Sequence, residues 1–205
     1  MREGSARVTA MSHTLSRQEG WSLLTEWVES ESLRRHCLAV EASMRAMARE
    51  RGADEELWGL TGLLHDLDYE RFPDMDAPDG HPRTALAELE RRGYPPELVR
   101  AVASHADHLG VSRDSELEKS LFAVDELSGF VLACAYVRPT GIHGLTPKSV
   151  KKKMKTPAFA AAVSREDLTR GAQELGVDFD DHVRFVVAAL EEHAAELGVD
   201  GDGGG

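Results

Sequence analysis

The chain has 205 residues, of which 41% are hydrophobic and 29% are charged. This balance is typical of one soluble globular domain with a sizeable core. Its formal net charge of -12 argues against a general binder of nucleic-acid polymers, which needs a basic surface. No segment approaches the roughly 20 apolar residues of a membrane span, and the N-terminal stretch lacks the apolar core of a secretory signal. Cys37 and Cys134 are too few for a disulfide framework and indicate reduced thiols. We therefore expect a cytoplasmic protein.

The spacing of apolar residues predicts a chain made almost entirely of helices. Ser16 and Glu19 have the form of a capping box that opens a first helix, and Asp54 is the expected N-cap of a third helix with an apolar stripe reaching Leu67. Proline and glycine predict a loop at 71–82. Further helices are expected at about 32–51, 83–92, 96–107, 115–137, 165–175 and 179–197, the last two capped by Ser164 and Asp178. No alternating pattern persists long enough to predict a sheet. The predicted fold class is all-α.

Polar residues that can bind metal interrupt these apolar helix faces. The adjacent pair His65-Asp66 ends the apolar run TGLLHDLDYE, and its nitrogen and oxygen atoms can reach one divalent cation. His36 lies on an inward stripe of its helix. Asp125 lies in the middle of another apolar stripe, where an isolated carboxylate is costly and needs a cation, a metal or a proton.

Two glycines accompany Asp66 on one side of its helix. Gly59 and Gly62 are helix-interior glycines, each costing roughly 1 kcal/mol relative to alanine. Their position predicts the close approach of another helix, and that helix would be the one that carries His36 or Asp125.

The ordered set of His36, His65-Asp66, the later histidines and Asp125 resembles the HD superfamily of metal-dependent phosphohydrolases. The resemblance runs from about His36 to about Ser128. It implies that one metal is bound by His36, His65, Asp66 and Asp125. In two-metal members, a histidine precedes one helix and another ends the following helix. His81 and His105 match these positions and would bind a second metal that Asp66 bridges, with His108 able to replace or assist His105. The two ions would then lie roughly 3.5–4 Å apart.

The resemblance also implies the organisation of the chain. We expect one HD-type helical domain over 16–198, with its metal-site core at about 33–137 and a C-terminal helical extension at 147–198. Residues 1–15 are expected to be disordered and residues 199–205 to be a flexible tail.

The expected chemistry is hydrolysis of a small phosphate ester or nucleotide by a metal-activated hydroxide, since a bound divalent ion lowers the pKa of water from 15.7 toward ~7. Asp66 would act at the centre of the site, and Asp68 and Glu70 are the expected proton-transfer groups. Many phosphomonoesterases of the superfamily carry a glutamate four residues after the site histidine. Here Tyr69 occupies that position, so a catalytic glutamate cannot be carried over. The ligand set permits one or two ions of Mn, Fe, Co, Ni, Zn or Mg.

A basic cluster, KSVKKKMK at 148–155, stands out in this acidic chain. In a helix, Lys151, Lys152 and Lys155 would share one side. They would either draw a phosphorylated metabolite toward the metals or form an ordinary solvated face.

Two other functions remain open from the sequence. Some HD-domain proteins act as di-iron oxygenases and use the same set of six ligand residues. A third possibility is a non-catalytic module that binds metal or nucleotide. Assembly into a homo-oligomer is also possible.

Overall fold

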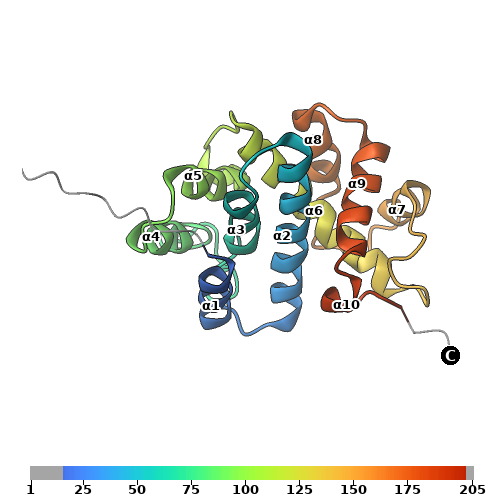
Figure 1. The fold of residues 1–205 in the computed structure, drawn as a ribbon, viewed down its shortest axis with the longest axis horizontal. Helices are drawn as coiled ribbons and strands as arrows, with labels where there is room; N and C mark the ends of the chain where they lie inside the picture. Colours follow the sequence, from blue (N-terminus) through green and yellow to red (C-terminus); the bar gives the residue numbers. More distant parts are fainter. Residues whose placement is uncertain (1–15, 202–205) are drawn as a thin grey trace, which may run out of the picture.

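The computed structural model describes residues 16–201, which contain helices and loops but no β-strand in that range (Figure 1). The helices are α1 (Arg17–Trp27), α2 (Glu31–Arg51), α3 (Glu55–Leu64), α4 (Arg83–Arg91), α5 (Pro96–His105), the 3₁₀ turn η1 (Asp107–Leu109), α6 (Glu116–Tyr136), α7 (Pro147–Met154), α8 (Arg165–Leu175), α9 (Phe179–Glu191) and α10 (Ala194–Leu197). The all-α fold class is confirmed. The N-terminal segment that we expected to be disordered lies outside the described residues.

Most helix starts agree with the predicted caps. The side chains of Asp54, Ser164 and Asp178 accept hydrogen bonds from backbone amides in the first turns of α3, α8 and α9. The capping box predicted at Ser16 was wrong, because the Ser16 side chain makes no capping hydrogen bond. A capping box does occur at the start of α6, where Ser115 and Glu118 satisfy each other's backbone amides.

Three helix ends differ from the prediction. α3 ends at Leu64, and a series of turns carries the chain on through residue 71. α5 ends at His105, followed by the short turn η1. The single helix expected at 179–197 is broken after Glu191, where the His193 amide bonds the Leu190 carbonyl three residues back. Such a bond tightens the last turn and stops the regular α ladder.

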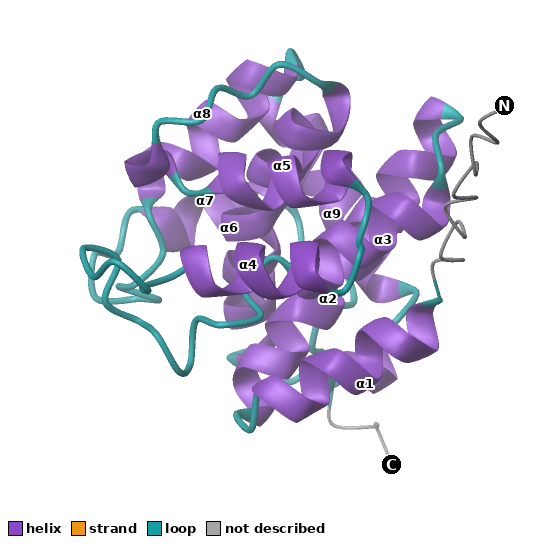
Figure 2. Ribbon diagram, turned by 90° about the vertical axis from the view of Figure 1, so that its left-hand side faces the viewer, coloured by secondary structure: helices purple, strands orange, loops and turns teal. Residues whose placement is uncertain are grey.

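The two longest helices, α2 and α6, each of 21 residues, run side by side through the middle of the molecule. α3 and α5 pack against each other on one side of this pair, with α1 beside α3 and α4 beside α5 (Figure 1). On the other side, α8 and α9 cover α6. The view along the perpendicular direction shows the same helices surrounding α2 and α6 (Figure 2). One continuous set of buried apolar residues extends from α1 to the residues after α10.

The close approach predicted from Gly59 and Gly62 is confirmed, and the approaching helix is α2. A Cβ atom added to Gly62 would lie 2.8 Å from the carbonyl oxygen of Val40. One added to Gly59 would meet the side chain of Arg45, which is also in α2. The small residues of α3 therefore allow this helix to lie directly against α2. The contact at Val40 is four residues from His36 in the sequence.

We expect Gly62→Ala to lower the free energy of unfolding by roughly 1–3 kcal/mol, the usual cost of overpacking. The added methyl would meet backbone atoms of α2, which cannot move without shifting the helix. Denaturant unfolding measures this effect. Gly20→Ala is the comparison variant and should cost less, because its methyl would meet the side chain of Leu60 and no backbone atom. Equal stability of the Gly62 variant and the natural protein would contradict the expectation.

The packed part of the chain continues beyond the predicted boundary at residue 198. Val199 is buried, and its carbonyl oxygen accepts a hydrogen bond from the Ile142 amide at 2.8 Å. Asp200 pairs with His143 at 2.8 Å. Val199 and Asp200 therefore remain in contact with the loop after α6. Residues 202–205 lie outside the described part.

Both cysteines are buried and free, as expected for reduced thiols. Within residues 16–201, every helix is too short or too polar to cross a lipid bilayer.

Candidate metal centre

The structure brings the six predicted ligand residues into one place from five segments of the chain. His36 comes from the second turn of α2 and Asp125 from the middle of α6. His65 and Asp66 lie at the point where α3 ends. His81 precedes α4 and His105 is the last residue of α5. Folding therefore gathers residues that are up to 89 positions apart in the sequence.

One group of ligand atoms consists of His36, His65, Asp125 and one oxygen of Asp66. The Nε2 atoms of His36 and His65 are 3.2 Å apart. They lie 3.1 and 3.3 Å from Oδ1 of Asp125. Oδ2 of Asp66 lies 3.6 and 3.5 Å from the same two nitrogens. Both imidazole nitrogens therefore lie close to a carboxylate oxygen of Asp66 and to one of Asp125, and His36, His65 and Asp66 form a group that could hold a metal ion.

The second group uses the other oxygen of Asp66. Nε2 of His81 and Nε2 of His105 are 3.3 Å apart, and Oδ1 of Asp66 lies 3.5 and 3.7 Å from them. Asp66 thus offers one carboxylate oxygen to each group.

These two groups fit divalent metal ions in both chemistry and spacing. Nitrogen and oxygen bonds to such ions are ~2.0–2.2 Å long, so ligand atoms arranged tetrahedrally around one ion lie roughly 3.4 Å apart. The observed separations of 3.1–3.7 Å bracket this value. The set of imidazoles and carboxylates without thiolates suits several first-row metals as well as Mg.

Hydrogen bonds on the far side of three imidazoles fix their orientation. Nδ1–H of His65 donates to the carbonyl oxygen of Gly62 at 2.8 Å. Nδ1–H of His105 donates to the carbonyl oxygen of Val102 at 2.5 Å. Nδ1–H of His81 donates to Oδ1 of Asp68 at 2.7 Å. With the proton held on Nδ1, each Nε2 lone pair is directed at the site, as metal-binding histidines require.

Asp68, one of the two predicted proton-transfer groups, is fully buried. Its second oxygen accepts a hydrogen bond from the Ala85 amide in the first turn of α4 at 2.7 Å. It therefore positions His81, and it is not among the residues that line the cavity above the ligands.

Glu70, the other predicted proton-transfer group, is exposed, and it accepts hydrogen bonds from the backbone amides of Glu29 and Ser30 at 2.8 and 3.0 Å. It connects the end of the α3 turns to the start of α2 and also lies outside the lining of the cavity.

Without metal, the negative charges of the ligand carboxylates favour protonation of the His65 imidazole. Burial lowers the pKa of His65, but the adjacent carboxylates of Asp66 and Asp125 outweigh burial and raise that pKa to about 10. Burial opposes ionisation of both carboxyl groups, yet the imidazoles, chiefly His65, hold the pKa of Asp66 and Asp125 below its ordinary value. The metal-free site is therefore a cluster of carboxylates around a protonated imidazole.

We expect metal affinity to rise with pH, because the metal must displace the proton of His65. His65 holds this proton at pH values below its pKa of about 10. For each proton that the metal displaces, the apparent affinity rises by roughly tenfold per pH unit. Calorimetric titration with Zn²⁺ or Mn²⁺ at several pH values, in two buffers of different ionisation enthalpy, measures both the affinity and the protons released. An affinity that does not change between pH 6 and pH 8 would contradict this assignment.

A cavity of about 570 Å³ opens above the ligand atoms. Its lining includes every ligand residue except His65, which is completely buried. The other lining residues are Leu33, Tyr69, Met75, Ala106, Asp107, His108, Phe122, Glu126, Ala162, Val163 and Asp167. The cavity is large enough for a small organic substrate next to the ligand cluster.

Two residues in this lining clarify the sequence interpretation. Tyr69, in place of the glutamate of related enzymes, packs its ring against His81 with centroids 5.1 Å apart. His108 also lines the cavity, but its Nε2 bonds the His81 carbonyl oxygen at 3.0 Å and it belongs to neither ligand group. His105, rather than His108, therefore occupies the ligand position.

Sequence reasoning missed Glu126, which lines the cavity beside Asp125. Burial and the nearby Asp125 carboxylate raise the pKa of Glu126 to about 7. The apolar stripe of α6 indicated Asp125 but gave no reason to select its neighbour. A pair of adjacent acids within an otherwise apolar segment was the available signal.

The basic cluster lies elsewhere. Lys151, Lys152 and Lys155 are on or directly after α7, and none of them lines the cavity. Lys151 forms an ion pair with Asp180 of α9 at 2.8 Å. The structure therefore gives no support to the predicted substrate contacts, and the solvated-face interpretation agrees with these positions.

Fold and site together define an all-helical domain with an ordered set of histidine and aspartate residues that could hold metal ions. Residues 33–129 match the family model of the HD domain, and all six ligand residues fall within this range. This part of the chain is an HD domain, of the superfamily of metal-dependent phosphohydrolases whose domains bind divalent metals. No curated protein and no solved structure gives a significant match to the chain.

Proposed function

We propose that this protein is a metal-dependent phosphohydrolase that cleaves a small phosphate ester. The observation that supports this most strongly is the carboxylate of Asp66, which presents one oxygen to each of two ligand groups. Such a shared carboxylate is suited to two metal ions held close together, an arrangement that occurs in many phosphatases.

The ions would supply a hydroxide at neutral pH and positive charge for the phosphate oxygens. The protein's own residues supply rigidity and shape. The carbonyl oxygens of Gly62 and Val102 hold two of the imidazoles, and Asp68 holds the third. Because these partners are buried or belong to the backbone, the ligand atoms stay in place without reorganising during the reaction.

The cavity determines how a substrate would enter. Its lining combines the ligand residues His36, His105 and Asp125 with the aromatic side chains of Tyr69 and Phe122. A phosphate group would therefore face the ligand cluster while the organic part lies against these rings. This arrangement places a single reactive group at the metals, as positioning for catalysis requires.

The test is phosphate release by protein that has been stripped with a chelator and reloaded with one metal at a time. We expect hydrolysis of at least one phosphomonoester with a redox-inert ion, Mg²⁺ or Zn²⁺, and loss of that activity when the chelator is added again. A broad panel of sugar, nucleoside and small-alcohol phosphates covers the substrate class.

Two results would replace this function by another. Oxygen consumption with iron, without phosphate release under any metal, would identify a di-iron oxygenase on the same ligand set. Tight metal loading without any turnover of either kind would identify a binding module. Fold alone does not separate these reactions, so the metal dependence decides among them.

A further inference from the structure

The cavity above the ligand cluster is acidic. Five carboxylate residues line it, namely Asp66, Asp107, Asp125, Glu126 and Asp167, and no lysine or arginine does so among the described residues. Two of the five, Asp66 and Asp125, belong to the ligand cluster, where bound metal ions would compensate their charge. The remaining three carboxylate residues, Asp107, Glu126 and Asp167, line the cavity outside the ligand cluster.

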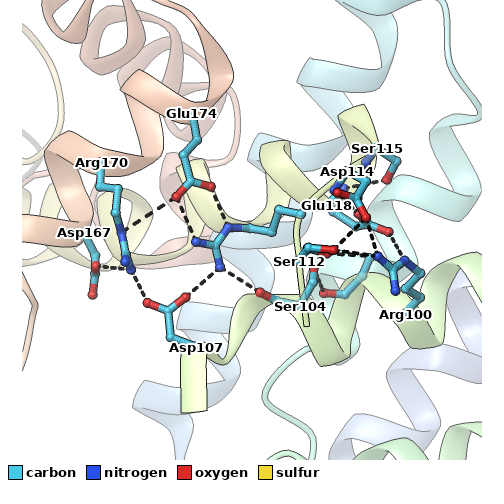
Figure 3. Close-up of polar contacts among 12 residues, drawn as sticks. Arg100, Ser104, Asp107, Ser112, Asp114, Ser115, Glu118, Asp167, Arg170 and Glu174 are labelled. Atoms are coloured by element: carbon cyan, nitrogen blue, oxygen red, sulfur yellow. Dashed lines mark hydrogen bonds and ion pairs between the residues drawn. The ribbon is translucent and has the colours of Figure 1, made fainter. Parts of the chain in front are cut away.

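Nearby arginines already neutralise two of these three. Arg170 pairs with both Asp107 and Asp167 (Figure 3), and Arg113 pairs with Asp107 at 2.8 Å and with Glu174 at 2.6 Å. The Arg113 side chain is only 9% exposed. These contacts join η1 to α8 and leave neither guanidinium free to bind an anionic substrate.

The same two guanidinium groups also stack on the ring of Phe122, at 3.7 Å for Arg113 and 4.8 Å for Arg170. Phe122 is one of the lining residues. Each arginine is therefore held by carboxylates and by an aromatic ring. Releasing one toward a substrate would leave Asp107 or Asp167 without its partner.

Glu126 is the exception. Within residues 16–201, no lysine or arginine forms an ion pair with Glu126, although the backbone of Ser164 and the imidazole of His36 favour its ionised form. It is half-buried in the wall of the cavity, next to the ligand Asp125. A carboxylate in this position repels a second anionic group and attracts a cationic one.

On the basis of the proposed function, we infer that the natural substrate is a phosphomonoester with a single anionic group, whose organic part carries an amino group that pairs with Glu126. The phosphate faces the metal ligands, the carbon chain lies against the apolar wall, and the ammonium group reaches Glu126. Nucleoside di- and triphosphates and carboxylated phosphate esters are disfavoured, because the cavity supplies no cation for the extra charge.

Binding of two matched phosphonates to metal-loaded protein tests this without requiring turnover. 3-Aminopropylphosphonate and 4-phosphonobutyrate have the same three-carbon chain but end in an ammonium and a carboxylate group. We expect the amino compound to bind about tenfold or more tightly by calorimetry, the ratio that corresponds to one favourable charge contact. Equal binding, or tighter binding of the carboxylate, would overturn the inference and leave the proposed function standing. If neither phosphonate binds, the inference fails, and phosphate release by the metal-loaded protein still decides the proposed function separately.

Variants of Glu126 assign the preference to this residue. Glu126→Gln should reduce the ratio of the two phosphonate affinities to near unity, and Glu126→Lys should reverse that ratio. Metal content should stay unchanged. Glu166→Gln is the matched control, because Glu166 lies on α8 beside Asp167 but is exposed and does not line the cavity. A preference that persists unchanged in Glu126→Gln would contradict the assignment. Metal content and the circular-dichroism spectrum show whether each variant is folded.

Discussion

Asp66→Ala is expected to abolish metal binding in both ligand groups and to reduce phosphate-ester hydrolysis by at least ~10³-fold. The reason is geometric, since one oxygen of Asp66 belongs to the group with His36 and His65 and the other to the group with His81 and His105. A metal ion contributes several kcal/mol to the stabilisation of a phosphoryl-transfer transition state, and ~4 kcal/mol corresponds to roughly 10³-fold in rate.

The metal content of chelator-treated and reloaded protein measures this effect. Asp125→Ala is the matched comparison, because Asp125 contacts only His36 and His65 and its loss should leave about one ion per chain. Asp66→Asn, which keeps the size of the side chain, should behave like Asp66→Ala. If the Asp66 variants retain as much metal as Asp125→Ala, the bridging role of Asp66 is wrong.

Asp68→Asn is expected to weaken binding of the second metal by ~10–100-fold, the usual effect of removing a partner that orients a ligating histidine. Asp68 accepts from Nδ1 of His81 at 2.7 Å and from the Ala85 amide at 2.7 Å. Loss of a charged acceptor for buried donors should also lower the free energy of unfolding by roughly 1–3 kcal/mol.

A loss of affinity at the second metal site alone distinguishes an effect on the orientation of His81 from a general loss of structure. The site at His36 and His65 should keep its affinity, which stepwise titration with Mn²⁺ or Zn²⁺ measures. Asp79→Asn, an exposed aspartate two residues before His81, serves as the control and should change neither affinity. Equal weakening of both sites in Asp68→Asn would point to a structural effect alone.

The helical order of the chain could be predicted from sequence because each helix carries its own signals. The apolar period and the caps at Asp54, Ser164 and Asp178 are local, and the structure confirms these caps. Gly62 was equally informative, because a glycine inside a helix has a cost that only close packing explains, and α2 lies where its side chain would be.

The ligand set could also be proposed from sequence, because polar residues within apolar stripes require a partner. Asp125 and His36 were selected on this ground, and the structure places their side chains 3.1 Å apart. His81 could not be selected in this way, since it lies in a loop without any period. Only the resemblance to a known family identified it.

The roles of Asp68, Glu126 and the arginine network could not be predicted, because they depend on contacts between distant segments. The turns after α3 direct Asp68 into the core toward His81, whereas the sequence suggested a proton-transfer group. Arg113 and Glu174 are 61 residues apart. Their pairing depends on how α8 packs on α6, which no local pattern specifies.

Crystals of the protein loaded with Mn²⁺ and measured at the manganese absorption edge would test the central claim most directly. We expect two anomalous peaks beside Asp66, one enclosed by His36, His65 and Asp125 and the other by His81 and His105. A single peak, or peaks away from Asp66, would contradict a bridged pair of metal ions and with it the proposed chemistry.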